Sequence, residues 1–523
     1  MSYVLNLATD RPFLTERVER VSGMDSYQRP TLLPSDIMAM MENRLVTDNG
    51  KCKVRPGFDA LGGGVIGAGY TTKIQGMQWH QRTGSQRLAA VCNTNLHNWD
   101  GTSWSAAVAG WAATASTSLV QMAPMNNKLY LVDGAKRIWE FDGTTFTELA
   151  GGDDPQAGAS IIVSHADRLF AAGYDGSVVA PYTIRASDLR DAGTGKWHPI
   201  NFNFQAGSDY APITALVPML RNWLVVFKEN AIFMVLCDPL ATTAALWNKQ
   251  EVSLELGCVG KRAAIRVGGD CWFWSQDGIR GITSSVGTEG AFELVAPYSQ
   301  PMQPYVDRVN SIYKHLITAH RYRDLVLFSV PLDDATEPSH TLVFNARLQQ
   351  WMGVWSGVAP TCWATSRFTG AAEQLVMGDT AARVNQWKDM DEQSLDATYT
   401  DNSVAIASTL TTKSFMFGEP DSNKDGDFVE FLFDRTFGVN ATITAYYDTV
   451  LAKTWQVNEL ATQNQLPLEL PFDLAVAGAQ RVRKELDAVG DFREVYFTIA
   501  TTDGNNVFLT ASVNAYLESV RDV

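Results

Sequence analysis

The sequence predicts an all-β protein: a β-propeller of about six to eight blades with an additional C-terminal β-sandwich-like domain. Two observations predict this fold. Between about residue 65 and Gly418, apolar residues form short runs such as KLYLVD, WLVVFK and CWFWSQ, separated by Gly, Asp and Asn, with almost no amphipathic helix. One turn motif also recurs at a spacing that suits a four-stranded blade.

The recurring motif is an Asp-Gly-Thr turn between two aromatic residues. It reads NWDGTSW over residues 98–104 and EFDGTTF over residues 140–146, so Asp100 and Asp142 are 142 − 100 = 42 residues apart. Asp-Gly favours a tight hairpin, and the flanking rings can pack between neighbouring sheets. The alternative is two unrelated hairpins that share common turn residues. Looser versions occur at residues 173–176, 275–278 and 344–351.

Changes of pattern along the chain predict three parts. They are an N-terminal extension and lead-in segment (1–64), the β-propeller (65–400) and a β-sandwich-like tail domain (401–523). In the first part, SDIMAMMENRL predicts a helix with Ser35 or Asp36 as its N-cap. In the last part, a helix or charged loop is expected around residues 479–487, between the strands.

Composition and charge exclude several classes of function. The net charge is −15, which argues against tight, sequence-independent binding to phosphate backbones because that binding depends on cations. An acidic wall would still let a DNA duplex pass without adhesion. The six cysteines include no CxxC pair, so the sequence predicts neither a zinc ribbon nor a dense disulfide framework.

Neither a secretory signal nor a membrane-spanning segment is expected. The N-terminus MSYVLNLATDRPFLTER lacks a basic start and an adequate apolar run. The uncharged stretch from Ser103 to Asn127 is rich in Ala, Ser and Thr and contains Gly110 and Pro124. That hydrophobicity is too low for a membrane helix, and two buried strands with a turn are predicted there instead.

A glycine pattern resembles a dinucleotide-binding motif but lacks its context. Gly62, Gly64 and Gly67 match G-x-G-x-x-G. The run follows a Pro-Gly turn rather than a strand and leads into no helix, whereas a pyrophosphate site needs the amides of a helix N-terminus. A loop is predicted, with no cofactor.

Acidic residues and histidines also fall short of metal sites. Asp421, Asn423, Asp425 and Gly426 resemble the start of a calcium loop, but Leu432 stands where a bidentate Glu is required, which favours a solvated hairpin loop. His315 and His320 bracket a predicted strand and would lie on opposite faces. The sequence therefore predicts no catalytic, cofactor-binding or metal-ligating residue. A site assembled from different blades would leave no such motif.

Two segments carry a resemblance to a known family. Residues 42–58, ENRLVTDNGKCKVRPGF, and residues 256–283, LGCVGKRAAIRVGGDCWFWSQDGIRGIT, resemble tail proteins of the nozzle or tail-stabilisation type from short-tailed bacteriophages. The matching positions of the second segment are Gly257, Cys258, Phe273, Asp277, Gly278, Ile279 and Arg280. The TKSFMFGEP strand before the tail domain is similar as well. The first thirty residues depart from the family pattern, being longer and more charged.

The resemblance implies a structural virion protein of the phage tail rather than an enzyme, made in the host cytoplasm. It implies a homo-oligomeric, hexameric ring that extends the channel of the portal and the head-tail adaptor proteins. Such a ring would retain DNA and conduct it during ejection without sequence-specific binding. Tail fibres or spikes would dock on its outer loops.

Two alternatives remain open at this point. A carbohydrate-binding or carbohydrate-cleaving β-propeller would use its abundant Trp to stack on sugar rings and paired carboxylates for acid–base chemistry. Trp clustered on one exposed rim would favour that function, whereas Trp buried between blades would favour a scaffold. The second alternative is an interaction hub of the WD or kelch type, for which two clear repeats are fewer than expected.

Overall fold

The computed structural model describes residues 13–174, 179–208, 210–220, 222–284, 292–388, 400–434, 439–459, 479–486, 492–501 and 507–517. The chain forms two compact units. The propeller unit comprises Phe58–Arg347 and Ser356–Lys388, and the sandwich unit comprises Met1–Gly57, Leu348–Trp355 and Asp389–Val523. Within the described ranges, no helix is long and apolar enough to cross a membrane.

In its described part, the propeller unit consists of seven antiparallel sheets. The first sheet contains β8 (Ile74–Arg82), β9 (Ser85–Cys92) and β10 (Asn95–Trp99), and the second contains β11 (Gln121–Met125), β12 (Lys128–Val132), β13 (Trp139–Phe141) and β14 (Phe146–Glu148). The third contains β15 (Ile161–His165), β16 (Arg168–Ala172), β17 (Ile184–Ala186) and β18 (Asn203–Phe204). The fourth contains β19 (Ile213–Pro218), β20 (Trp223–Lys228), β21 (Ile232–Leu236) and β22 (Asn248–Ser253). The fifth contains β23 (Ala264–Val267), β24 (Asp270–Ser275), β25 (Gly278–Ser284) and β26 (Phe292–Leu294). The sixth contains β27 (Thr318–Tyr322), β28 (Leu325–Val330) and β29 (His340–Asn345). The seventh contains β31 (Cys362–Ser366), β32 (Gln374–Gly378), β33 (Val384–Trp387) and β7 (Phe58–Ala60).

Helices are few and short in this unit. They are the 3-10 turns η2 (Leu61–Gly63), η3 (Ala244–Leu246), η4 (Gln300–Met302) and η5 (Lys314–Leu316), and the single α-helical turn α1 (Gln303–Val306). The core is therefore made by the sheets themselves, with side chains of consecutive blades packed face to face.

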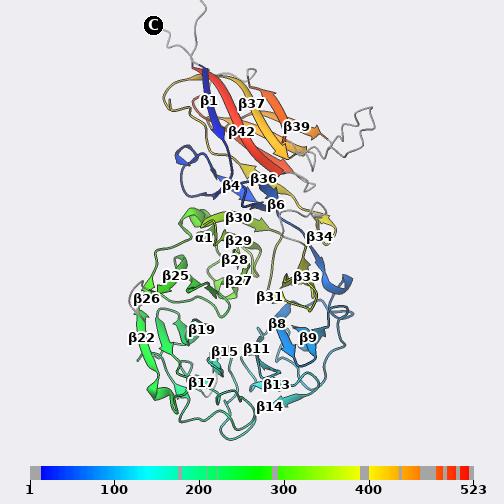
Figure 1. The fold of residues 1–523 in the computed structure, drawn as a ribbon, viewed down its shortest axis with the longest axis vertical. Helices are drawn as coiled ribbons and strands as arrows, with labels where there is room; N and C mark the ends of the chain where they lie inside the picture. Colours follow the sequence, from blue (N-terminus) through cyan, green and yellow to red (C-terminus); the bar gives the residue numbers. More distant parts are fainter. Residues whose placement is uncertain are drawn as a thin grey trace, which may run out of the picture. The chain divides into compact units, whose positions relative to one another are not determined.

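The first strands of the seven sheets form a closed ring. In the order β8, β11, β15, β19, β23, β27 and β31, each contacts the next, and β31 contacts β8 again. Figure 1 shows the blades arranged around this centre. The predicted β-propeller is thus confirmed, and the seven blades fall within the predicted range.

The last blade is completed by a strand from the other end of the unit's sequence. β7 pairs antiparallel with β33, so that Phe58 lies opposite Trp387. Their rings are 5.5 Å apart, and Lys388 Nζ lies 3.0 Å from Asp59 Oδ2. This pairing closes the circle and satisfies an edge of β33 that would otherwise be open.

The Asp-Gly-Thr repeat occupies equivalent positions in the first two blades. Asp100 Oδ1 accepts hydrogen bonds of 2.8 Å from the N–H groups of Thr102 and Ser103. Asp142 Oδ1 does the same for the two residues at the corresponding positions, also at 2.8 Å. The flanking aromatics pair across each hairpin, Trp99 with Trp104 and Phe141 with Phe146. The prediction of a true repeat is confirmed for this pair.

The looser versions are not all equivalent. Residues 275–278 connect β24 to β25, the second and third strands of their blade, whereas the repeat connects the third and fourth. In the version at 173–176, Asp175 and Gly176 lie outside the described residues. Asp-Gly is a turn signal that suits more than one hairpin of a blade, so the residue types alone do not fix the position.

In its described part, the sandwich unit contains two large sheets and a small parallel pair, β2 (Gly23–Met24) and β3 (Ile37–Met38). One has the order β40 (Ala479–Glu485), β37 (Lys424–Asp434), β42 (Val507–Leu517), β6 (Cys52–Val54) and β5 (Arg44–Val46), with β1 (Phe13–Val18) also paired to β42. The other joins β30 (Gln350–Ser356), β4 (Met40–Glu42), β36 (Ser408–Thr411), β41 (Val495–Thr501), β38 (Val439–Tyr447) and β39 (Val450–Glu459). The other small elements are η1 (Pro30–Leu32), β34 (Thr400–Asp401) and β35 (Val404–Ala405).

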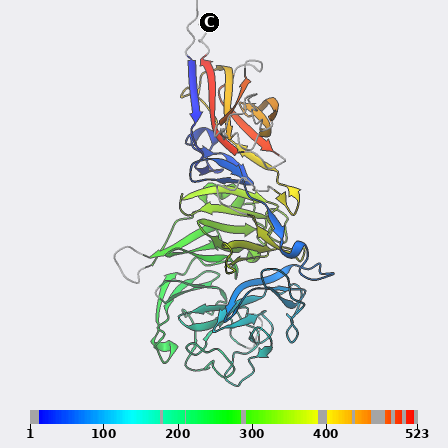
Figure 2. The ribbon, with the colours of Figure 1, turned by 45° about the vertical axis from the view of Figure 1, so that its right-hand side comes forward.

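The inner faces of these two sheets pack on each other. Phe431 of β37 and Phe497 of β41 are both fully buried, with their rings 5.4 Å apart. Strands from both ends of the chain take part, because β1 lies beside β42, as Figures 1 and 2 show. The predicted β-sandwich-like domain is confirmed.

Two local predictions in this unit are wrong: the helix at SDIMAMMENRL, and the helix or charged loop around residues 479–487. The segment SDIMAMMENRL forms β3, β4 and β5 instead of a helix. Asn43 has a φ of 53°, which breaks a helix and separates β4 from β5. β4 pairs with β36 far along the chain, and β5 pairs with the nearby strand β6. Ala479–Glu485 is the strand β40, paired with β37. Tertiary pairing overrides local helix propensity in both places.

A buried arginine holds the segment after β6 in the sandwich unit. Arg55 is 1% exposed, and its two terminal nitrogens contact both carboxylate oxygens of Asp401, at 2.9 Å for Oδ1. Its Nε donates to Asn43 Oδ1 at 3.0 Å, and the Asn43 amide donates in turn to the carbonyl of Ala407. A Cβ on Gly57 would lie 1.9 Å from the carbonyl oxygen of Thr400. Asn43, Arg55 and Gly57, all within residues 42–58, therefore build one structural clamp.

Removing Arg55 is expected to destabilise the sandwich unit strongly. The Arg55→Ala variant leaves the Asp401 carboxylate partly buried without its cation, which should lower the free energy of unfolding by about 3 kcal/mol. Urea denaturation followed by fluorescence measures it. Arg20→Ala is the control in the same unit, because Arg20 is 70% exposed and lies 3.7 Å from Asp36; its loss should cost under about 1 kcal/mol. Equal losses in both variants would contradict the clamp.

Candidate functional site

The axis of the propeller is enclosed by the first strands of the seven blades. A hollow of about 180 Å³ lies between the first strands, lined by Met77, Gln121, Ala264, Thr318 and Trp363 among others. A hollow of this size holds a small cluster of water molecules.

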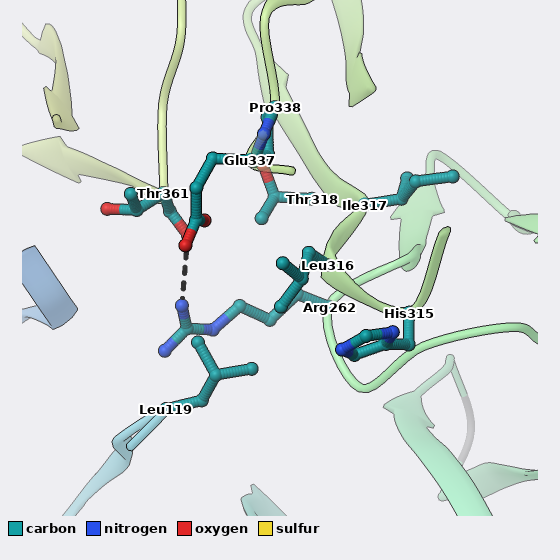
Figure 3. A pocket seen from close by; sticks show the side chains of 9 residues that line it. All are labelled: Leu119, Arg262, His315, Leu316, Ile317, Thr318, Glu337, Pro338 and Thr361. Carbon is teal, nitrogen blue, oxygen red and sulfur yellow. Dashed lines mark hydrogen bonds between the residues drawn. The ribbon is translucent and has the colours of Figure 1, made fainter. Parts of the chain in front are cut away.

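Arg262 crosses the axis at the end where the first strands begin. It precedes β23, and its Nη1 donates to the carbonyl of Thr361 at 3.0 Å, the contact drawn in Figure 3. Its Nη2 donates to the carbonyls of Gln75 at 2.7 Å and Val120 at 2.8 Å. One guanidinium thus joins the fifth blade to the seventh, first and second. Burial lowers the pKa of this arginine.

An ion pair beside Arg262 also helps to close this end of the propeller axis. Lys73 Nζ lies 2.7 Å from Glu337 Oε1. Glu337, Arg262 and Thr361 together border a separate small cavity, shown in Figure 3. Because every contact of Arg262 goes to backbone carbonyls, this cation is occupied by the protein itself. The arrangement fixes blades relative to one another and offers no free group for chemistry.

Arg262 was not singled out by the sequence. It stands in GKRAAIR beside a strand, and nothing local distinguishes it from an exposed arginine. Only the ring of blades brings the carbonyls of Gln75, Val120 and Thr361 together around it. A lone cation just before an inner strand is the weak signal that could have found it.

The motifs found in the sequence do not form one site. His315 borders the small cavity that Arg262 also lines, and His320 lies on the inner strand β27, whereas the acidic motif belongs to the sandwich unit. Leu61–Gly63 form the short turn η2, and Gly64 is extended, so the glycine pattern is a loop. Asp421 and Asn423 precede β37, which includes Asp425 and Gly426. His315 lies in η5, while His320 on β27 bonds through its Nε2 to Thr365 Oγ1 at 2.9 Å. Among the described residues, no group of three His, Cys, Asp or Glu is placed to hold a metal.

Residues 256–283 connect the fourth blade to the fifth and form the first strands of the fifth blade. A Cβ on Gly257 would lie 1.9 Å from the carbonyl oxygen of Lys228, and the N–H of Cys258 donates to that oxygen. Cys258 is fully buried, and its thiol points to the carbonyl of Gly260 at 3.3 Å. These contacts explain the Gly-Cys pair as a close approach of two backbones.

The end of the same segment forms a second small clamp. Asp277 and Arg280 form an ion pair across the turn between β24 and β25, and this contact lowers the pKa of Asp277. Gly278 has a φ of 124°, and a Cβ there would meet Ser299 Oγ at 2.3 Å. The Asp-Gly-Ile-Arg sequence therefore serves packing of the fifth blade.

Replacing Arg262 is expected to loosen the propeller. Arg262→Met keeps much of the side-chain volume but removes the donor to the carbonyls of Thr361 and Val120, while the Gln75 carbonyl keeps the N–H of Val120; this should cost about 3 kcal/mol of unfolding free energy. Chemical denaturation of the full chain measures it. Arg321→Met is the control, because Arg321 is exposed and its Nε bonds to a carbonyl two residues away; it should change stability little. An unchanged Arg262→Met protein would contradict the role given to this residue.

A single methyl group at Gly257 is expected to disturb the fourth and fifth blades. Gly257→Ala places a Cβ against the carbonyl of Lys228, and relief of that overlap should cost about 2 kcal/mol. The control is Gly269→Ala, since a Cβ at Gly269 meets no atom within 4 Å. Melting temperatures of the two variants test the difference. A Gly257→Ala protein as stable as the control would refute the close approach.

Comparisons with solved structures show low similarity. YCF48 bound to D1 peptide matches with a TM-score of 0.40 and 11% identity, covering 66% of this chain and 98% of that one. The computationally designed Ika8 protein matches with a TM-score of 0.38 and 13% identity, covering 67% of this chain and 96% of that one. The N-terminal domain of Nup159 matches with a TM-score of 0.41 and 9% identity, covering 66% of this chain and 98% of that one. These scores carry no argument about function. A search of curated proteins found no match.

A family model gives the decisive comparison. The Phage_stabilise model, described as "Bacteriophage P22 Gp10, beta-propeller", matches residues 21–388. That range includes both segments whose resemblance was noted in the sequence and all seven blades of the propeller unit. The chain therefore belongs to the phage tail-stabilisation family of β-propeller proteins.

Proposed function

We propose that this chain is a structural virion protein of the tail nozzle that assembles as a hexameric ring. The ring extends the channel of the portal and head-tail adaptor proteins, retains DNA in the filled capsid and conducts it during ejection. Tail fibres dock on its outer loops. The chain is made in the host cytoplasm and performs no catalysis. The observation that carries the proposal is the family match over residues 21–388.

The closed propeller axis supports a channel between copies. Arg262 and its carbonyl partners occupy one end of the axis, and the hollow beyond them is about 180 Å³. A DNA duplex, with a major groove alone about 12 Å wide, does not fit there. DNA conducted by this protein therefore has to run outside each propeller, in a lumen that several copies surround.

The tryptophans favour a scaffold over a carbohydrate-binding propeller. The chain has 15 Trp, all in the described part, and none of them is exposed. Trp272, for example, is 3% exposed and stacks on Tyr298 at 4.2 Å, and Trp363 is 8% exposed and donates to Ser329 Oγ. Rings that pack within and between blades are not available to stack on a sugar.

The division into residues 1–64, 65–400 and 401–523 stays a prediction for the functional parts. In this proposal, the middle part is the rigid spacer and docking body, and the last part is the nozzle. The acidic net charge of −15 supports a lumen wall that does not adhere to phosphates.

Phage particles made with and without this chain test the proposed function. Particles lacking it should package DNA and then lose it, so that filled heads decrease while capsid yield stays constant. Nuclease-resistant DNA per capsid is the measurement, and electron microscopy of complete particles should show the chain as a six-fold ring on the tail. Retention of DNA without the chain, or its absence from purified virions, would contradict the proposal.

A further inference from the structure

The propeller has a second, larger hollow at the end of the axis where the first strands finish. Its volume is about 500 Å³, and it lies beside the ends of β11, β15 and β19 and the strand β23. The turns that border it are tight: Asn126 and Asn127, like Ala166 and Asp167, have positive φ values. Such turns fix the backbone of the rim.

The charged groups of this hollow leave an excess of positive charge. Asp167 is its one lining carboxylate among the described residues, and Arg190 pairs with it at 2.9 Å. The N–H of Arg190 also donates to the Asp167 carbonyl, and the Asn126 amide donates to the carbonyl of Arg190. This network holds Arg190 in place and neutralises Asp167.

Arg266 on β23 has no such compensation. Its Nε donates to the carbonyl of Gly268 at 3.0 Å, and no ion pair involves it within the described residues. It is exposed and lines the hollow. The remaining guanidinium nitrogens are therefore available to a ligand, unlike those of Arg262 at the other end, which contact carbonyls of the protein.

His165 adds an unused ring nitrogen at the same place. It ends β15 and lines the hollow, and its Nε2 is buried without a hydrogen-bond partner in the described structure. Burial, together with the charge of Arg266, lowers its pKa. An anion bound in the hollow would offset the charge of Arg266 and raise the pKa of His165, because a negative charge nearby favours the imidazolium.

We propose that this hollow is a binding site for a compact oxyanion, a carboxylate or a phosphate group, held by Arg266 with Arg190 at its rim, and that the charge of the neighbouring His165 imidazole adds to its binding. A guanidinium offers paired N–H donors that match both groups. Arg266, His165, Arg190 and Asp167 are the charged and titratable side chains facing the site. The proposal goes beyond the tail function, which needs no ligand at the propeller.

Calorimetric titration of the full chain with acetate and with inorganic phosphate tests the site, with ionic strength held constant by chloride. We expect saturable binding of one anion per chain. Stronger binding of acetate identifies the natural group as a carboxylate, such as an acidic side chain of a partner, and stronger binding of phosphate identifies it as a phosphate. Absence of saturable binding for both would overturn the proposal.

Two variants separate the site from nonspecific attraction. Arg266→Gln should weaken binding about tenfold, the loss expected for one charge-assisted hydrogen bond. Arg321→Gln is the matched control, since Arg321 is also exposed and donates its Nε to a carbonyl two residues along, that of Arg323, but it does not line the hollow. Equal effects of the two substitutions would overturn the proposal. Circular dichroism verifies that both variants are folded.

The pH dependence of acetate binding tests the part played by His165. In the unchanged chain, affinity should rise as the pH falls from about 8 to about 6, because the imidazole takes up a proton when the anion binds. In the His165→Gln variant this increase should disappear while Arg266 still binds the anion. The same pH dependence in both proteins would remove His165 from the site.

Discussion

The pairing of β7 with β33 is the constraint on which the propeller depends. A radial array of sheets has a first and a last blade, and the last is complete only when a strand from the start of the unit joins it. Here Phe58 lies opposite Trp387 although 329 residues separate them (387 − 58). Without this pairing the ring would have an open edge at β33 and no fixed diameter.

The closed ring explains why so much of the chain serves packing. Arg262 can bond to carbonyls of three other blades only because those blades are held at a fixed distance. Gly257 and Gly278 permit approaches that a Cβ would block. The segments that resemble the family are thus places of tight contact between backbones.

The two ends of the propeller axis differ in what they leave available. At one end Arg262 is used by the protein, and the hollow along the axis is small. At the other end Arg266 and His165 keep unused nitrogens beside a hollow of about 500 Å³. A scaffold that closes its own axis can still present a recognition site at its mouth, because strand-end turns tolerate variation that the inner strands do not.

The sequence by itself determined the fold class, the repeat and the family. Short apolar runs of period two and Asp-Gly-Thr turns are local signals, and β-strands with tight hairpins follow from them directly. The resemblance of residues 42–58 and 256–283 was likewise readable from residue types, and the family match over residues 21–388 confirms it.

Tertiary structure decided the rest, because the missing information is not local. SDIMAMMENRL has the apolar spacing of a helix, yet it becomes strands, one of which pairs with β36, hundreds of residues away. The number of blades depends on how the ring closes at β7, and the roles of Arg55, Arg262 and Arg266 depend on which carbonyls and carboxylates the fold brings near each guanidinium. Three arginines of one chemical type are thereby a buried clamp, an axial crosslink and an open cation.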